Sequence, residues 1–214
     1  MAVLLFFILI GALFLSNPPY TNLSSDINFF KGLGQVIGFQ KRDLDRMVKR
    51  SKHHSAPPKK MEGLVDGRYL KVCINELEGG AFLKWKIDIQ WACKNPYAID
   101  LQMQPETTLS SIGKQLGMQD VEVFDERLDK AYLIKCNHRQ FPLQQFSTDF
   151  SQRLLSKQEV TSTIQVKEKN VHYSDIVYLP KESMIDYISF LVDTNKLLVE
   201  MVDNWQPLYK LNQA

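Results

Sequence analysis

The sequence predicts an α+β domain, in which an antiparallel sheet of about six strands carries helices on one face, preceded by an N-terminal membrane-anchor helix. Three observations predict this class: an apolar opening stretch, strict alternation of apolar and polar residues after Gly67, and helical spacing of apolar residues near the C-terminus. Hairpin strands with helices between and after them are typical of α+β domains. We therefore divide the chain into an anchor (residues 1–20), a basic juxtamembrane helix with a linker (21–60) and a globular α+β domain (61–214).

The opening stretch predicts a membrane anchor. It runs from Ala2 to Leu15 without a charge, and Pro18 and Pro19 end any helix there. Its fourteen residues would cover about 21 Å of a hydrocarbon core of about 30 Å, so a thin bilayer or a longer helix is needed. A cleaved signal peptide and a buried core helix remain alternatives, although no basic residue precedes the stretch and no small-x-small site follows it. The anchor residues include Leu4, Phe6, Phe7, Ile8, Leu13 and Phe14.

Positive charge is concentrated before the domain. Residues 1–60 carry nine Lys/Arg against three Asp/Glu, whereas residues 61–214 carry seventeen against twenty-one. A basic arm on a mildly acidic domain does not fit a domain-wide nucleic-acid surface, and we expect no nucleic-acid partner. Because basic residues follow the apolar stretch and none precedes it, the positive-inside rule places the arm and the domain in the cytoplasm.

The basic arm predicts an amphipathic helix over residues 26–52, followed by a linker with the sequence HHSAPPKK. Cations on this helix could contact anionic lipid headgroups, since each Lys or Arg near such a leaflet gains about 1 kcal/mol. The alternative is a solvated helix face joined to a flexible tether. The candidate headgroup ligands are Lys41, Arg42, Arg46, Lys49, Arg50 and Lys52.

Alternating residues predict the strands of the domain. Residues 68–77 and 83–93 read as a hairpin around Glu78, Gly79 and Gly80, and residues 97–104 extend it. Trp85 and Trp91 fall on the apolar face of the second strand and are expected in the core. Residues 131–136 predict a further strand, and residues 161–179 predict two strands that meet at a turn near Asn170.

Helical spacing predicts three helices in the domain. The first is short, over residues 107–117, with a threonine cap and a glycine stop. The second covers residues 141–155, with Pro142 in its first turn, and the third is a long amphipathic helix over residues 184–205. The resulting order is three strands, helix, strand, helix, two strands, helix.

No motif identifies a chemistry. The sequence contains no GxSxG, P-loop, GxGxxG or HExxH pattern, so we assign no catalytic residue and no cofactor, and whether the chain is an enzyme stays open. Cys136 and His138 lack the spacing of a zinc module, so no metal site is expected. The acidic residues between Glu122 and Asp129 alternate with Arg127 and Lys130, which is typical of a solvated face. Three widely spaced cysteines fit thiols in a reducing compartment.

Residues 120–205 resemble the soluble domain of a bacterial family of membrane-associated proteins of unknown function. In that family a Phe-Asp segment leads into a strand, a helix ends in a Leu-Leu pair, and a paired strand ends in Val-Tyr. The matching positions are Phe124, Asp125, Tyr132, Leu154, Leu155, Val177 and Tyr178, whereas Leu128 stands where the family has an aromatic residue. The resemblance implies a membrane-tethered domain and no known activity.

The sequence therefore favours a membrane-tethered, non-enzymatic interaction or accessory domain whose partners are membrane lipids and a second protein. The alternative is an enzyme or a small-ligand or lipid carrier, with a cavity between the sheet and the C-terminal helix.

Overall fold

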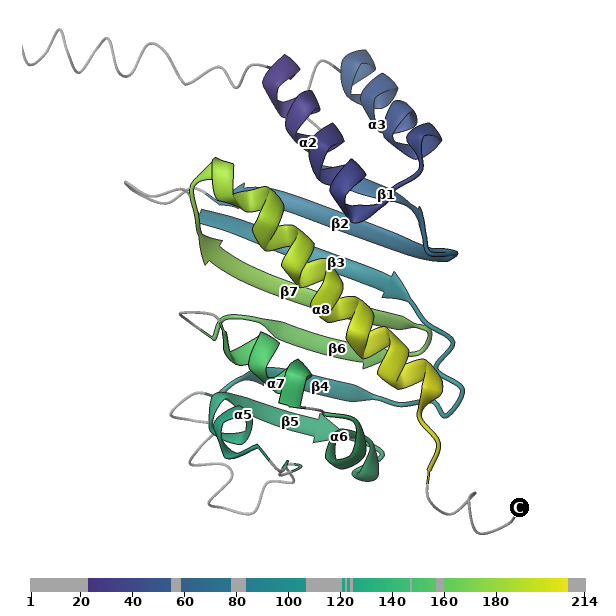
Figure 1. Ribbon diagram of the computed structural model, residues 1–214, viewed down its shortest axis with the longest axis vertical. Helices are drawn as coiled ribbons and strands as arrows, with labels where there is room; N and C mark the ends of the chain where they lie inside the picture. Colours follow the sequence, from purple (N-terminus) through teal and green to yellow (C-terminus); the bar gives the residue numbers. More distant parts are fainter. Residues whose placement is uncertain are drawn as a thin grey trace, which may run out of the picture.

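The computed structural model describes residues 23–54, 59–77, 84–106, 121, 123, 125–146, 148–156 and 160–207, and it has an α+β architecture built on one sheet (Figure 1). The predicted anchor over residues 1–20, the turn at Glu78–Gly80 and the helix expected at 107–117 lie outside these residues. Among the described helices, none combines the length and apolar character that a membrane span requires.

The sheet has seven strands in the order β1-β2-β3-β7-β6-β4-β5, and every neighbouring pair is antiparallel. The prediction of about six strands missed one, β1, because Gly63 interrupts a short segment that lies where the linker was expected to end. The strands are β1 (Lys60–Val65), β2 (Arg68–Leu77), β3 (Lys84–Ala92), β4 (Leu101–Pro105), β5 (Tyr132–Cys136), β6 (Thr163–Lys167) and β7 (Asn170–Tyr178).

The strand predicted over residues 97–104 begins only at Leu101, because Asn95 organises a turn before it. Asn95 and Ala98 have positive φ angles of 43° and 51°. The Asn95 side chain accepts from the Ile99 backbone N–H at 2.8 Å and donates to the carbonyls of Ile99 and Glu168 at 2.9 and 2.6 Å. This buried amide therefore joins the start of β4 to the β6–β7 turn.

The described residues form six α-helices and one short 3-10 helix. They are α2 (Leu23–Ile37), α3 (Lys41–His54), α5 (Glu126–Ala131), α6 (Gln140–Gln145), α7 (Thr148–Leu155), the 3-10 helix η1 (Lys181–Ser183) and α8 (Met184–Asn204). The single helix predicted over 141–155 is instead α6 and α7, since Phe146 at the end of α6 leaves the helical region with ψ at 84°.

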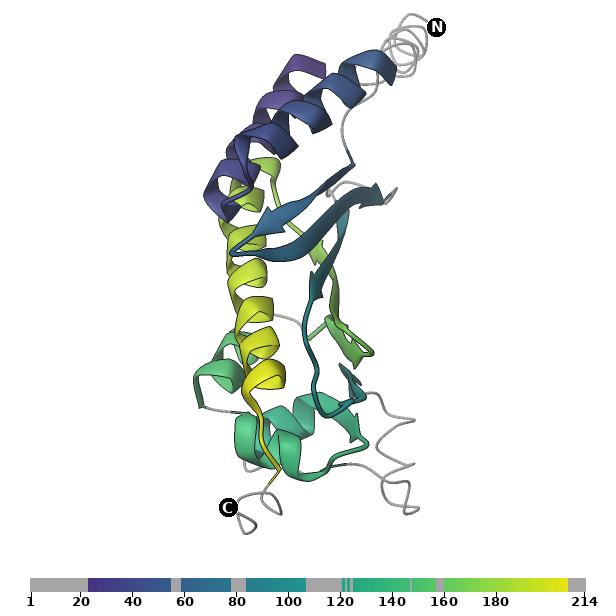
Figure 2. The ribbon, with the colours of Figure 1, turned by 90° about the vertical axis from the view of Figure 1, so that its right-hand side faces the viewer.

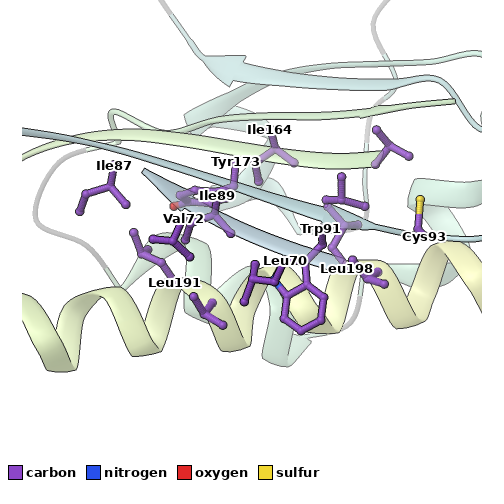
Figure 3. Close-up of a cluster of buried hydrophobic side chains, with 14 of the residues drawn as sticks. Leu70, Val72, Ile87, Ile89, Trp91, Cys93, Ile164, Tyr173, Leu191 and Leu198 are labelled. Atoms are coloured by element: carbon purple, nitrogen blue, oxygen red, sulfur yellow. The ribbon is translucent and has the colours of Figure 1, made fainter. Parts of the chain in front are cut away.

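The helices gather on one face of the sheet. In Figure 2 the sheet is seen nearly edge-on, with α2, α3 and α8 on one side of it. Alternate residues of the central strands point toward α8 and form the core, as the apolar pattern predicted; Figure 3 shows Leu70, Val72, Ile87, Ile89 and Trp91 beside Leu191 and Leu198. Trp85 is only partly buried, and its Nε1–H donates to the Leu179 carbonyl at 3.0 Å.

Helix α2 packs onto the same core. Phe30, Leu33 and Ile37 of α2 are buried in one continuous cluster with the sheet and α8. Lys181 at η1 forms an ion pair with the buried Asp26 carboxylate near the start of α2. Helix α2 is therefore held by apolar packing and by a charge contact, and it acts as a part of the folded body.

Candidate functional site

The single amphipathic helix predicted over residues 26–52 is instead two helices, α2 and α3, which form a tight antiparallel hairpin. Gly38 follows α2 with φ at +94°, a conformation that favours glycine after a helix, and the Phe39 N–H donates to the Gly34 carbonyl at 2.9 Å. Gly34 also permits close packing, because a Cβ there would overlap the Leu44 side chain. The C-terminal end of α3 consequently returns to the end of the molecule where α2 begins (Figure 2).

The inner side of α3 is fixed against the sheet. Asp43, Leu44 and Ser51 are buried, and Asp43 lies over Gly63 of β1 so closely that a Cβ at Gly63 would be 2.8 Å from Asp43 Cγ. These contacts restrict rotation of α3 about its own axis. The outward side of the helix is therefore presented in one orientation.

All six candidate headgroup ligands lie on the exposed side of α3, which we call the basic face. The exposed side-chain fractions of Arg42, Arg46 and Arg50 are 64%, 69% and 55%. The arrangement follows from the sequence, because the apolar and short residues of α3 recur at helical spacing and leave the remaining positions to solvent. The basic face comprises Lys41, Arg42, Arg46, Lys49, Arg50 and Lys52, and Asp45 is the one exposed acid of α3 among them.

Three of these cations have acidic partners. Arg42 and Arg46 each approach Asp43 Oδ1 at 3.7 Å, and Arg50 Nη1 lies 3.3 Å from Glu62 Oε1. Burial opposes ionisation of Glu62, but hydrogen bonds from Tyr69, Lys60 and Arg50 lower the pKa of this carboxyl overall. Within the described parts of the chain, Lys41, Lys49 and Lys52 have no carboxylate partner, so their charge is available to an external anion.

The sheet face opposite the helices carries a second charged surface, the open sheet face. One row of paired residues crosses all seven strands in register, and the other outward positions flank this row. The row consists of Glu62, Lys71, Gln90, His172, Gln165, Gln102 and Lys135. Amides and an imidazole occupy its centre, with a lysine toward each side.

Lysines predominate among the charged residues of the open sheet face. The outward strand positions hold Lys60, Lys71, Lys84, Lys86, Lys135 and Lys167 but only two acids, Glu62 and Asp88. Glu62 pairs with Lys60 at 3.3 Å, while Asp88 pairs with Lys86 at 3.5 Å and lies 3.7 Å from His172 Nε2. The face is therefore positively charged, although the domain from residue 61 onward is acidic.

A shallow hollow interrupts the open sheet face at the β6–β7 hairpin. Its volume is about 280 Å³, and it is lined by Gln165, Lys167, Glu168, Asn170 and His172. The Asn170 amide is held in place because its Oδ1 accepts from Gln90 Nε2 at 3.1 Å. The lining combines hydrogen-bonding amides and an imidazole with one cation and one carboxylate, which suits an uncharged polar group.

A buried polar cluster lies under α8, at the other face of the sheet. Asp175 of β7 is 1% exposed and accepts from Thr161 Oγ1 at 2.6 Å, Tyr187 OH at 2.7 Å and the Ile176 N–H at 3.0 Å. Burial, together with the Asp175 charge, raises the pKa of Tyr187. Tyr187 therefore stays protonated as a donor, and the cluster joins β7 to α8 without offering a proton acceptor to solvent.

Other candidate groups from the sequence have structural contacts. His138 Nε2 lies 2.9 Å from the Tyr97 carbonyl oxygen and its ring packs on Trp205, while the Cys136 sulfur lies 4.0 Å from Asn137 Oδ1. Asp125 caps α5 by accepting from the Arg127 and Leu128 N–H groups. Over the described residues, no cluster of three or more histidine, cysteine or acidic side chains is placed to hold a metal ion.

The six anchor residues from Leu4 to Phe14 lie outside the described residues, so the basic face is the predicted site that the structure brings together. The open sheet face was missed because its residues come from strands that are not consecutive in the chain. Comparison of the chain with protein-family models, with curated proteins and with solved structures finds no significant match.

Proposed function

We propose that this chain is a membrane-tethered, non-enzymatic interaction domain that presents the basic face of α3 to anionic lipid headgroups on the cytoplasmic side. The observation that carries the proposal is the fixed position of this face. Its C-terminal half, with Lys49, Arg50 and Lys52, lies at the end of the molecule where the chain enters α2 from the apolar N-terminal stretch. A tether and a basic surface at one end favour contact with the same membrane.

One further feature supports this proposal over its alternative. The space between the sheet and α8, where a ligand carrier would need a cavity, holds the fully buried side chains of Trp91, Phe150, Leu191 and Leu198. This packing argues against the enzyme or carrier alternative.

The test compares the partitioning of the full-length chain onto vesicles of phosphatidylcholine with and without phosphatidylglycerol. The ratio of the two partition coefficients removes the contribution of apolar insertion and leaves that of charge. Replacing Lys49, Arg50 and Lys52 by glutamine should reduce this ratio about 100-fold at low salt, since each cation contributes about 1 kcal/mol.

A matched control replaces Arg127, Lys130 and Arg153 by glutamine. Arg127 and Lys130 are exposed on α5 and Arg153 is half-buried on α7, all far from α3 in Figure 1, so the control has the same net charge without altering the basic face. An equal loss in both variants, or no loss in either, would contradict contact through α3.

A further inference from the structure

The open sheet face carries more positive charge than its own acids neutralise. Within the described residues, Lys71, Lys84, Lys135 and Lys167 have no carboxylate partner. Lys71 faces Glu62 across β1 and β2, but the Glu62 carboxylate already accepts from Tyr69, Lys60 and Arg50. Lys84, Lys135 and Lys167 face uncharged residues across the neighbouring strands. An anionic partner that covers this face would neutralise the excess of lysine, since opposite charges placed across a sheet surface stabilise it.

The chemistry of the row favours a polypeptide as that partner. Its centre offers the amides of Gln90, Gln165 and Gln102, which can donate to and accept from a peptide backbone. Lys71 and Lys135 stand on either side of these amides, where they can pair with carboxylates. We propose that the open sheet face is a docking site for an extended acidic polypeptide segment that runs across the strands.

The dimensions of the row set the length of the segment. Lys71 on β2 and Lys135 on β5 are separated by five strand-to-strand steps in the sheet order. At about 4.8 Å a step this distance is about 24 Å, which about seven extended residues span. Acidic residues near both ends of such a segment, with uncharged polar residues between them, match the row. The hollow at Lys167 and Asn170 accommodates one of the uncharged polar side chains near the middle of the segment.

The aromatic residues of this face disfavour single-stranded nucleic acid as the partner. Stacking of bases requires open rings beside the cations. Tyr69 donates its OH to Glu62 at 3.0 Å and lies near one edge of the sheet, whereas Lys84 lies over the Tyr178 ring at 5.4 Å. Neither ring stands at the centre of the row, and the row contains no arginine.

The test uses fluorescence anisotropy with the full-length chain in a non-ionic detergent. The probe is a labelled peptide with two glutamates at each end and four serines between them, and its control has glutamine in place of each glutamate. We expect the acidic peptide to bind and the glutamine peptide not to bind. Replacing Lys71 and Lys135 by glutamine should weaken binding about tenfold, since each exposed ion pair contributes up to about 1 kcal/mol.

Two matched variants locate the effect. Glutamine at Lys130 and Arg153, on the helix side, should leave peptide binding unchanged, and so should glutamine at Lys49 and Lys52 of the basic face. Equal binding of the two peptides, or unchanged affinity after replacement of Lys71 and Lys135, would overturn the proposal.

Competing occupants give different results. A thymidine oligonucleotide or phosphatidylglycerol vesicles that bind tighter than the peptide, and lose affinity when Lys71 and Lys135 are replaced, would overturn a polypeptide partner. Concentration-dependent self-association that disappears in the same variant would instead assign the face to a second copy, whose α8 exposes Asp186, Asp193 and Glu200.

Discussion

The attachment of α3 to the sheet depends on the absence of a side chain at Gly63. A methyl group there would lie 2.8 Å from Asp43 Cγ and 3.0 Å from Asp43 Cβ, both shorter than a van der Waals contact. Asp43 is buried and its Cβ is close to the helix backbone, so a change of rotamer cannot relieve the overlap. Gly63→Ala should therefore move α3 away from β1.

Overpacking of this kind costs about 1–3 kcal/mol. For a chain of this size, each 1 kcal/mol lowers Tm by about 2–4 °C, so the variant should melt roughly 4–8 °C below the parent if the cost is near 2 kcal/mol. Differential scanning calorimetry gives the shift, and hydrogen exchange of the α3 amides shows whether the loss is local to that helix.

Gly32→Ala is the matched control. Gly32 lies inside α2, and a Cβ there would meet only Ile185 Cδ1 at 3.9 Å, an ordinary contact. Alanine should raise stability by about 0.5–1 kcal/mol, because glycine is a poor helix former. If Gly63→Ala melted at or above the parent temperature while Gly32→Ala behaved as expected, the close contact between α3 and β1 would be refuted.

Three further outcomes follow from buried polar groups. Asn195 on α8 is 1% exposed, and neither polar atom of its side chain has a hydrogen-bond partner among the described residues. Asn195→Leu, which keeps the branching, should therefore raise the free energy of unfolding in urea by about 1–3 kcal/mol. A loss of stability would indicate a bound partner for the amide. Asn95→Ala removes three hydrogen bonds at the start of β4 and should lower the free energy of unfolding by about 2–4 kcal/mol in the same assay. A change below about 0.5 kcal/mol would show that the turn does not depend on this side chain. Burial raises the pKa of Tyr132 from 10.0 to about 12. The contribution of this shift to stability, about 3 kcal/mol, is complete below pH 10 and is lost as the pH rises toward 12. Tyr132→Phe should flatten this part of the profile of stability against pH, and an unchanged slope would contradict the raised pKa.

The sequence predicted the strands best where a two-residue period was long. Ile87, Ile89 and Trp91 are buried together on one face of β3, as their alternation indicated. The period gave no signal for β1, which pairs with β2 although Gly63 interrupts its pattern. The alternation of residues within β1 cannot predict such a strand, because its pairing with β2 is what stabilises it.

The packing role of α2 could also not be predicted from the local sequence. The glycines of this helix lower its helix propensity. Gly34 instead allows Leu44 of α3 to approach the α2 backbone, so tertiary packing outweighs propensity. The spacing of residues in α3 did predict an amphipathic helix with its cations outward, and this part of the candidate site is recovered in the structure.

The open sheet face required the strand order. Each of its lysines stands at an alternate position that the sequence marks as outward, but β3 pairs with β7 and β4 pairs with β6. Residues as distant as Gln90 and His172 therefore become neighbours. A sequence alone gives no means to align these positions into one row.

Lysine footprinting tests the proposed membrane contact of the basic face most directly. The full-length chain is placed in lipid nanodiscs of phosphatidylcholine with or without phosphatidylglycerol, and the acetylation rate of each lysine is followed by mass spectrometry. We predict that Lys49 and Lys52 react several-fold more slowly in the anionic discs, while Lys130, on the exposed side of α5, reacts at the same rate in both. Equal rates at Lys49 and Lys52 in the two kinds of disc would contradict contact between α3 and anionic headgroups.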